Sequence, residues 1–516
     1  MGRIRRTKMQ YFSTESSITL YWEKTDNLPS DYSYRIYANE KQIAETKKTH
    51  ITLNNLEENT RYFVQVQVWN KDVLFESYET MQIWTTAKKR ILDVSKAPYN
   101  AVGDGMTLNT KILQQAINDC GIKDVVYIPA GVYLTGALKL HSDMEIYIEK
   151  DGVLQGTDVP TDYLPRIHSR FEGIEMECYS SLLNLGELDS KAGYTSGNVV
   201  IHGEGTIASG GRNLAENIIE SEKMLLKEYM DSLGDCLQEY ECLDTIPGRV
   251  RPRLINISNA KDVRISGLTL KNGASWNVHM IYSKDIVTNH CTFYSEDVWN
   301  GDGWDPDSST DCTIFDCKFY TGDDSIAIKS GKNPEGNIIN RPSEHIRIFD
   351  CVSYFGHGIT IGSEMSGGIK DIKIWDCDFG KSMYGLEIKG TKKRGGYVKN
   401  IHMQDCTVPR IMLHSVGYND DGISAGAAPE FLDCVFENIE ITGSYLDADN
   451  ISRPCQAIEL CGFDEEGHEI KNIAFRNIHI NTKEDMPAIF SVCRCEGLSF
   501  ENIRHTVKKT SDNIEK

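Results

Sequence analysis

The chain has 516 residues, of which 40% are hydrophobic and 25% are charged, and its formal net charge at pH 7 is −20. This length allows more than one domain and a large buried core, and the composition is typical of a soluble globular protein. The acidic balance argues against nucleic acid as a partner, and the sequence has no run of about eighteen apolar residues that would predict a membrane span.

Residues 8–88 are predicted to form a small antiparallel β-sandwich. Six segments alternate apolar and polar residues with the period of half-buried strands: SITLYWEK, YSYRIYANE, KQIAETK, HITLNN, RYFVQVQVWN and MQIWTTA. Leu56, Thr60 and Tyr62, together with Trp22, resemble the tyrosine-corner pattern of fibronectin type III modules. We expect this module to be a spacer or a wall beside a substrate groove, with sugar binding as the alternative. The junction is expected in KKRILDV at 88–94.

A second domain is predicted at residues 91–507, followed by a polar tail at 508–516. The segment 107–121 has the apolar spacing of an amphipathic helix, with Leu108, Ile112 and Ile117 on one side, and we expect it to cap one end of the domain. Residues 213–247 interrupt the strand pattern with a Glu-rich helical insertion. This insertion either overhangs a substrate groove or is a solvated surface helix.

An alternating apolar phrase recurs through the second half of the chain, with a small residue in one slot. We align Gly267, Cys291, Cys317, Cys351, Cys377, Cys406 and Cys434 in this slot, at separations of 24, 26, 34, 26, 29 and 28 residues, and later Asn477 and Asn502. A period in the twenties, with short strands and glycine-rich turns, is typical of a solenoid of stacked coils. The fold class is therefore predicted as all-β, with a right-handed parallel β-helix after the N-terminal β-sandwich.

The 15 cysteines do not suggest a disulfide framework. Their number is odd, no CxxC spacing recurs as in zinc sites, and six lie in the repeat slot, so most are predicted to be reduced core residues. The N-terminal segment MGRIRRTKMQYFSTESS has the charges of an export signal without its apolar part. These features favour a cytoplasmic location, or secretion if a signal segment has been removed.

Four glycine-rich stretches gather acids, one histidine and several cations: NGDGWDPDS at 300–308, TGDDSIAIKSG at 321–331, FGHGITIGSEMSGG at 355–368 and GLEIKGTKKRGG at 385–396. Cleavage of a glycosidic bond needs one protonated carboxyl group and one ionised carboxylate. Asp323 and Asp324 are adjacent, and like charges that close do not both ionise readily, so we expect one to stay protonated near neutral pH. Asp302 and Asp323 are 21 residues apart, which places them on neighbouring coils.

The order of these stretches resembles the polygalacturonases, glycoside hydrolase family 28, whose motifs are Asn-x-Asp, Gly-Asp-Asp, Gly-His-Gly and Arg-Ile-Lys. Three motifs match residue for residue. The resemblance implies inverting hydrolysis of α-1,4-galacturonosidic bonds in pectic oligo- or polygalacturonate, without a cofactor or a metal. It implies that Asp323 is the general acid and that Asp302 and Asp324 hold and deprotonate the attacking water. The implied substrate-binding residues are Asn300, His357, Lys389 and Arg394.

The phrases RPRLIN, ASWNVH and GSEMSGG look most like the exo-acting bacterial members of this family, so exo action is expected. His357 is expected to orient or tune the acid, and Lys389 to pair with a substrate carboxylate. Taken singly, Asp302 is also a common turn former and His357 a common loop residue. Asp305 and Asp307, on either side of Pro306, are predicted to be turn residues.

One position departs from the family pattern, because Glu387 stands where Arg is usual. In a strand, its side chain points to the same face as that of Lys389, two residues later. Either Glu387 pairs with a cation such as Lys389 or Arg394, or the neighbouring subsite binds a sugar other than plain galacturonate. Local cations are needed in any case, since the net charge disfavours a polyanionic substrate at long range.

Three alternatives therefore remain beside galacturonan hydrolysis. A rhamnogalacturonan or substituted-galacturonan hydrolase is favoured if Glu387 selects the substrate. A calcium-dependent pectate lyase is the second, because clustered aspartates can bind Ca²⁺. A carbohydrate-binding solenoid without catalytic activity is the third. A pectic oligosaccharide is the expected partner, and the sequence does not predict the oligomeric state.

Overall fold

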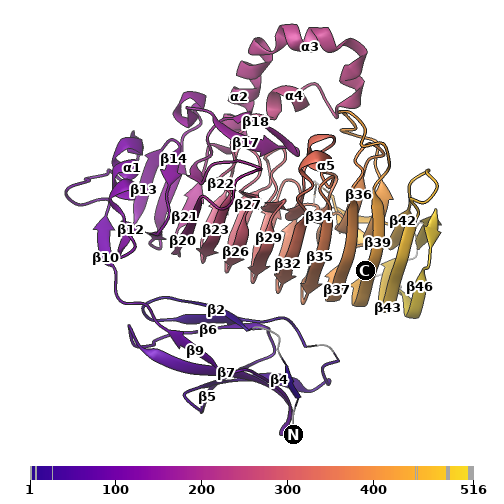
Figure 1. The fold of residues 1–516 in the computed structure, drawn as a ribbon, viewed down its shortest axis with the longest axis horizontal. Helices are drawn as coiled ribbons and strands as arrows, with labels where there is room; N and C mark the ends of the chain where they lie inside the picture. Colours follow the sequence, from indigo (N-terminus) through magenta and orange to yellow (C-terminus); the bar gives the residue numbers. More distant parts are fainter. Residues whose placement is uncertain are drawn as a thin grey trace, which may run out of the picture. The chain divides into compact units, whose positions relative to one another are not determined.

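The computed structural model describes residues 3–5, 9–25, 27–447, 449, 451–483 and 489–508. The chain divides into two compact units, Met1–Arg90 and Ile91–Lys516, which Figure 1 colours from indigo to yellow. The boundary falls within the expected junction at 88–94, whereas residue 8 and residues 509–516 of the predicted tail lie outside the described residues. Among the described residues, no helix is long and apolar enough to cross a membrane.

The first unit consists of two sheets that share one apolar core, as the sequence predicted. One sheet has the order β1 (Arg3–Arg5), β8 (Val73–Tyr78), β7 (Arg61–Asn70), β4 (Tyr32–Ala38) and β5 (Lys41–Thr46), with β9 (Met81–Trp84) also beside β7. The other sheet consists of β2 (Gln10–Ser13), β3 (Ile18–Tyr21) and β6 (His50–Leu53). Leu20 of the second sheet joins Ile36 and Val66 of the first in the buried core. This arrangement is a β-sandwich.

Tyr62 forms the predicted tyrosine corner. The backbone N–H of Glu57 donates a hydrogen bond of 3.0 Å to the Tyr62 hydroxyl, five residues later in the chain. Trp22 is buried, and its ring meets the Tyr34 ring edge-on at 5.1 Å between centroids. Such a corner is typical of sandwiches of the immunoglobulin and fibronectin type III kind.

The second unit is a parallel β-helix built from three long sheets of parallel strands (Figure 1). Sheet 1 has 14 strands: β10 (Arg90–Asp93), β12 (Asp124–Ile128), β15 (Met144–Ile148), β20 (Ser196–Gly203), β23 (Ala260–Ser266), β26 (Lys284–Asn289), β29 (Thr310–Phe315), β32 (Ser343–Phe349), β35 (Ile369–Trp375), β37 (Tyr397–Val408), β39 (Glu430–Ile441), β43 (Ile470–Lys483), β45 (Cys495–Glu496) and β46 (Ser499–Lys508). Sheet 2 has eight strands: β11 (Asp104–Leu108), β13 (Gly131–Thr135), β16 (Gly152–Gly156), β21 (Thr206–Ala208), β24 (Thr269–Lys271), β27 (Thr292–Ser295), β30 (Lys318–Thr321) and β33 (Val352–Phe355).

Sheet 3 has 11 strands: β14 (Leu138–Leu140), β19 (Leu183–Leu185), β22 (Ile255–Ser258), β25 (Val278–Ile281), β28 (Trp304–Asp307), β31 (Ile326–Ile328), β34 (Gly358–Ile361), β36 (Gly385–Gly390), β38 (Ile411–Ser415), β42 (Ile458–Cys461) and β44 (Phe490–Cys493). Two short antiparallel hairpins lie outside these sheets, β17 (Ile167–Phe171) with β18 (Ile174–Cys178), and β40 (Ser444–Leu446) with β41 (Ser452–Pro454). The three sheets enclose one continuous apolar core along the solenoid. The predicted fold class is thus confirmed.

A ladder of buried cysteines runs through this core, as predicted for five of the six cysteines in the repeat slot. The strand registers align Cys291, Cys317, Cys351, Cys377 and Cys406 on successive coils. Beside this ladder the Phe315, Phe349 and Trp375 rings stack in turn, with centroids 4.9 and 4.4 Å apart. Neighbouring coils therefore stabilise one another through like-on-like packing.

The predicted slot was wrong at both ends of this ladder. Leu268, not Gly267, lies beside Cys291, and Ile439, not Cys434, pairs with Cys406. Asn477 and Asn502 lie one position before the slot, in register with Asn438. Asn438, Asn477 and Asn502 have positive φ angles of 54°, 54° and 54°. Asn tolerates this left-handed conformation, so the Asn in the later phrases marks the turn before the slot rather than the slot itself.

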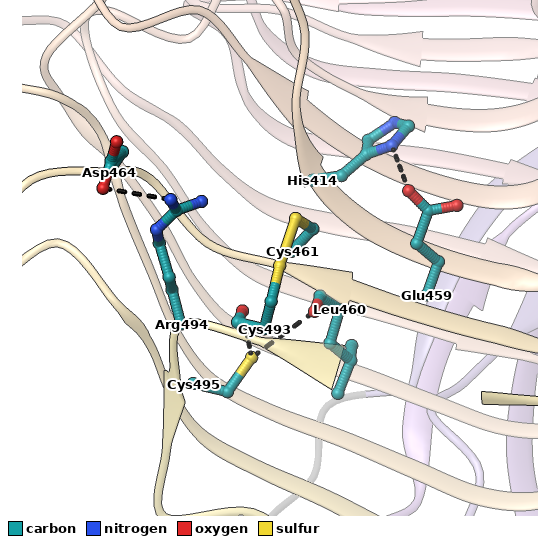
Figure 2. Close-up of a disulfide and its surroundings, with 8 residues drawn as sticks. All are labelled: His414, Glu459, Leu460, Cys461, Asp464, Cys493, Arg494 and Cys495. Carbon is teal, nitrogen blue, oxygen red and sulfur yellow. Dashed lines mark hydrogen bonds and ion pairs between the residues drawn. A yellow bond between two sulfur atoms is a disulfide. The ribbon is translucent and has the colours of Figure 1, made fainter. Parts of the chain in front are cut away.

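One pair of cysteines departs from the predicted reduced state. Cys461 of β42 and Cys493 of β44 are register partners in sheet 3 and form a disulfide (Figure 2). Most of the other cysteines are buried. The two partners are 32 residues apart, so the pairing follows from the stacking of coils and not from a local motif.

Helices close one end of the solenoid and cover one of its sides. The predicted cap is α1 (Thr110–Asp119), which buries Leu113, Ala116 and Ile117, whereas Leu108 lies in β11 and is half exposed. The predicted insertion forms α2 (Gly211–Leu225), α3 (Lys227–Leu233), the 3₁₀ helix η2 (Gly234–Glu239) and α4 (Thr245–Gly248). These helices arch over the side of the solenoid that also carries β17, β18 and α5 (Glu335–Ile339) (Figure 1). A second 3₁₀ helix, η1, spans Pro160–Tyr163.

Candidate active site

The predicted acids come from consecutive strands of sheet 3. Asp302 lies just before β28, Asp323 and Asp324 just before β31, and His357 just before β34. The register pairs Trp304 with Ile326, Ile326 with Ile359 and Ile359 with Leu386. Asp302 lies two residues before Trp304, and Asp324 lies two residues before Ile326. The two acids therefore occupy equivalent positions on neighbouring coils. The stacking of coils thus brings together motifs that are separate in the sequence.

Asp302 is almost completely buried and is paired with a lysine that the sequence analysis did not single out. Its side chain is 3% exposed, and Lys329 Nζ lies 3.1 Å from Asp302 Oδ2. Burial raises the pKa of Asp302 well above its usual value, although the positive charge of Lys329 opposes this shift. The signal was present in IAIKSG, because a lysine at the end of a buried apolar strand needs an acidic partner.

His357 lies between the two adjacent acids. Its Nδ1 is 2.8 Å from Asp323 Oδ1 and 3.4 Å from Asp324 Oδ1, and the Thr360 hydroxyl donates a hydrogen bond of 2.6 Å to Asp324 Oδ1. Burial would lower the pKa of His357, but the two carboxylates raise it well above its usual value. His357 is therefore a cation at neutral pH.

The sequence predicted that charge repulsion keeps one of the two adjacent acids protonated. The structure instead favours the ionised form of Asp323. Burial would raise the pKa of Asp323, but the His357 charge lowers it to about 2. The positive charge of His357 stabilises the ionised form of Asp323. In this structure, the proton near Asp323 is held by His357, and the aspartates of the site with raised pKa values are Asp302 and Asp305.

Asn300 orients Asp323. Its Nδ2 donates to Asp323 Oδ2 at 3.4 Å, while its Oδ1 accepts a hydrogen bond of 2.6 Å from Arg251 Nη2. The Arg251 guanidinium is fully buried and lies 4.3 Å from the centroid of the Trp299 ring. Because Arg251 fixes the carbonyl oxygen of the Asn300 amide, the amide nitrogen must point toward Asp323. Arg251 is a second residue that the sequence analysis did not identify.

Asp305 and Asp307 are not turn residues, as the sequence suggested, but lie in the buried strand β28. Register partners on β25 pair with Asp305, Pro306 and Asp307, so an Asp-Pro-Asp triplet with the composition of a turn is held extended by its neighbours. Asp307 pairs with Arg170 Nη1 at 2.8 Å and lies 3.3 Å from His279 Nε2. Burial would raise the pKa of Asp307, but Arg170 lowers it to about 2.

Glu387 is paired with two cations, which is the first of the two explanations open at the sequence level. Lys389 Nζ lies 3.0 Å from Glu387 Oε2, and His414 Nε2 lies 2.9 Å from Glu387 Oε1. His414 Nδ1 in turn lies 3.2 Å from Glu459 Oε1 (Figure 2). Burial opposes the charge of His414, but the hydrogen bond to Glu387 raises its pKa to about 9. Lys389 Nζ also lies 5.6 Å from the Tyr418 ring centroid. The negative charge of Glu387, next to Lys389, is balanced by the two cations.

Arg394 does not lie where the prediction placed it. Its side chain is fully buried, and all three guanidinium nitrogens donate hydrogen bonds within the protein. Nε binds Ser363 O at 3.0 Å, Nη1 binds Asn333 Oδ1 at 2.6 Å, and Nη2 binds Asn419 O at 2.6 Å. These contacts hold three loops together, and we therefore exclude Arg394 from the substrate-binding residues.

The insertion reaches the loops around the site. The Glu241 backbone N–H donates to Asn419 Oδ1 at 2.9 Å, and Glu239 Oε1 lies 3.2 Å from Lys393 Nζ. Burial and the charge of Asp323 raise the pKa of the Glu241 carboxyl group. The helical insertion is thus fixed beside the acids rather than being only a solvated surface helix.

Asp323, Asp324 and His357 could supply three ligand atoms that lie within 4.8 Å of one another. A histidine binds a metal only through a deprotonated nitrogen. Here both carboxylates hold the proton on His357, whose pKa is raised. The three residues therefore fit an acid and its positioning cation better than a metal centre at neutral pH.

Comparisons with known proteins agree with this geometry. Residues 195–423 match the family model of glycosyl hydrolases family 28. A probable polygalacturonase of Vitis vinifera is 32% identical over 332 residues, which cover 62% of this chain and 61% of that protein. An exo-poly-alpha-D-galacturonosidase of Dickeya chrysanthemi is 25% identical over 446 residues, which cover 82% of this chain and 73% of that protein.

Solved structures of two exopolygalacturonases share the fold. The family 28 exopolygalacturonase of Yersinia enterocolitica superposes with a TM-score of 0.80 at 22% identity, covering 98% of this chain and 99% of that one. The exopolygalacturonase of Thermotoga maritima gives a TM-score of 0.65 at 25% identity, covering 81% of this chain and 92% of that one. The motif order, the β-helix and the matched residues agree: residues 195–423 of the second unit resemble glycosyl hydrolases family 28.

Proposed function

We propose that this protein is a glycoside hydrolase that cleaves α-1,4-galacturonosidic bonds in pectic oligo- or polygalacturonate. One observation carries the proposal: Asp302, Asp323, Asp324 and His357 meet on adjacent strands of a domain that resembles family 28. Polygalacturonases are also the relatives whose sequences match most of the chain, which supports galacturonate as the sugar. Lys389 supplies the positive charge that a uronic acid requires.

The geometry gives each residue a task in hydrolysis. His357 gives a proton to Asp323, whose Oδ1 lies 2.8 Å from His357 Nδ1, and Asp323 gives it to the leaving glycosidic oxygen as the bond from that oxygen to the anomeric carbon breaks. Asp324, held by Thr360, and Asp302 position a water molecule and accept its proton as the oxygen of that water bonds to the same carbon. The proposed reaction inverts the anomeric configuration, as the family resemblance implies.

The test is incubation of the purified protein with trigalacturonate, with and without a chelator, followed by mass analysis of the products. Saturated mono- and digalacturonate that form equally in both samples are the expected result. An unsaturated product that disappears with chelator would indicate a lyase instead. If trigalacturonate is not cleaved, the proposal is wrong for this substrate, and rhamnogalacturonan fragments are the next to be tested.

Exo action is proposed from the contacts of the insertion. Glu239 and Glu241 fix it to the loops of Lys393 and Asn419, next to the acids, where it can close one end of the substrate groove. The segments α3 and η2 bury no residue, so they can be removed with little effect on the core.

Deletion of residues 227–240, with a short glycine linker, is therefore expected to change the products from polygalacturonate. The intact protein should release mainly one short product from the start, whereas the deletion variant should also release longer oligomers early in the reaction. Chromatography of early time points measures this. An unchanged product series from a folded, active deletion variant would show that the insertion does not decide exo action.

Lys389→Ala is expected to raise KM for trigalacturonate by roughly 10- to 100-fold, because a hydrogen bond to a charged group contributes about 1.5 to 3 kcal/mol. Glu387 keeps its contact with His414 in this variant, so the strand should stay folded. Lys370→Ala is the control, since Lys370 lies on β35 of sheet 1 and pairs with Glu344. An unchanged KM in Lys389→Ala would remove Lys389 from the substrate-binding residues.

A further inference from the structure

Lys329 is not one of the residues that the motifs assign to the site, but hydrogen bonds to neighbouring coils fix its backbone beside them. It follows β31, and its N–H donates to Pro306 O at 2.9 Å. Its carbonyl oxygen accepts hydrogen bonds from Ser308 N at 3.0 Å and from Ser343 Oγ at 2.6 Å. The start of the side chain is therefore held in one place by the neighbouring coils.

The ammonium group of Lys329 lies among acids in a dry environment. Nζ is 3.1 Å from Asp302 Oδ2, 3.5 Å from Asp305 Oδ1 and 4.0 Å from Glu364 Oε2. The ring of Trp276 covers it, with 4.5 Å between Nζ and the ring centroid. The side chain is 5% exposed, so water screens these charges little.

The two aspartates depend on this lysine. Among the described residues, Asp302 Oδ1 and both carboxyl oxygens of Asp305 have no hydrogen-bond partner. Both aspartates are buried, and an unpartnered buried carboxylate is costly. Lys329 is thus the ion-pair partner that holds both carboxyl groups in place.

We propose that Lys329 and Asp305 are positioning residues for Asp302: Lys329 fixes the direction of the Asp302 carboxylate and favours its ionised form, while Asp305 opposes that form. This inference rests on the proposed hydrolysis, in which Asp302 must be ionised to accept a proton from water. Neither residue touches the substrate in this role. They set the range of pH over which Asp302 is competent.

The surrounding charges agree with this division of tasks. Burial and the negative charges of Asp305, Asp323 and Asp324 raise the pKa of Asp302, and Lys329 lowers it. Burial raises the pKa of Asp305 to about 7, also against Lys329. Three further ionisable groups lie near the pair: Arg251, His279 and Glu364. Asp302 and Asp305 are therefore neighbouring buried acids whose pKa values are both raised and whose titrations are linked.

Two variants are expected to move the acidic limb of the kcat/KM profile in opposite directions. Lys329→Met removes the charge but keeps the length of the side chain, so the limb should shift to higher pH by about one unit or more. Asp305→Asn removes the like charge, so the limb should shift to lower pH. Lys329→Arg keeps a cation, and its limb should stay closer to that of the unmodified protein.

Lys332→Met is the matched control, because Lys332 is an equally buried lysine three residues later that pairs with Asp421. A purely structural role for Lys329 would lower activity at every pH without moving the limb, and that result would overturn the inference. If Lys329→Met does not fold, Lys329→Arg and Asp305→Asn still decide the question.

Carboxyl titration by ¹³C NMR of the full-length protein keeps this test separate from the test of function. The aspartate resonances that vanish in Asp302→Asn and Asp305→Asn identify the pair. In Lys329→Met one of them should titrate at higher pH, whether or not the protein hydrolyses galacturonate. If Lys329→Met hydrolyses the substrate but neither the acidic limb nor the aspartate resonances shift, the inference is wrong. If the resonances shift but the protein does not hydrolyse galacturonate, only the proposed function is wrong.

Discussion

Asp323→Asn is expected to lower kcat on trigalacturonate by roughly 10²- to 10⁴-fold, the range that one acid–base group contributes to catalysis. The amide has the shape of the carboxyl group but cannot pass a proton from His357 to the leaving oxygen. KM should change much less, because the contacts of Lys389 with the substrate remain. Steady-state kinetics at several pH values measure both parameters.

The pH dependence gives this prediction a second readout. The carboxylates hold the proton on His357 well above its usual pKa, so activity that uses this proton should persist above pH 7 and fall only as His357 deprotonates. Asp311→Asn, on the half-exposed side chain that pairs with Lys284, is the control and should have the unmodified kcat. Residual activity in Asp323→Asn within a few-fold of the intact protein would show that Asp323 is not the acid.

The largest effect on stability is expected from Asp307→Asn. This change leaves the fully buried Arg170 guanidinium without the carboxylate that lies 2.8 Å from it. Breaking a buried ion pair by removing one partner costs about 3 to 5 kcal/mol. Glu175 Oε1, 3.4 Å from Arg170 Nη2, compensates part of the remaining charge, so a loss near the lower end of this range is expected. The urea midpoint of the β-helix unit should fall accordingly at pH 7. Asp305→Asn is the matched control in the same strand, and its raised pKa predicts a much smaller loss.

The pair also predicts how stability responds to acid. The pKa of Asp307 is lowered from 3.8 to about 2, so its contribution is complete above pH 3.8 and is lost as the pH falls through about 2. This linkage is worth roughly 2 kcal/mol. Between pH 4 and 2 the intact protein should lose this amount in excess of Asp307→Asn. Parallel acid profiles for the two proteins would contradict the ion-pair assignment.

Much of the fold followed from local patterns in the sequence. Three features repeat along the chain: period-two strands, glycine-rich turns and a buried cysteine, as at Cys317, Cys351 and Cys377. They repeat because each coil must form the same strands and turns and fill the same core position as the next. The predicted slot failed at Gly267 and Cys434, and also at Asn477 and Asn502. At the two asparagines the repeated letter marked a backbone turn, which side-chain pattern alone does not distinguish from a core position.

Interactions between coils could not be predicted in this way. Lys329 and Asp302 are 27 residues apart, and Arg170 and Asp307 are 137 apart. Glu387 looked repulsive toward a polyanion until His414, on the next strand of sheet 3, supplied a second cation. The extended conformation of the Asp305–Asp307 segment was likewise imposed by partners on β25 and by Lys329, which follows β31.

The sequence by itself determined the strand patterns of the two domains and the order of the motifs, because both depend on residue type and spacing. The motifs in turn identified the candidate site residues Asn300, Asp302, Asp323, Asp324, His357 and Lys389. The tertiary structure alone decided which acids carry raised pKa values, which cation serves each acid, that Arg394 is buried and that the insertion contacts the site. Those properties depend on burial and on distances between residues of different coils. Both determine the strength of an electrostatic interaction, and neither is encoded in any single stretch of the chain.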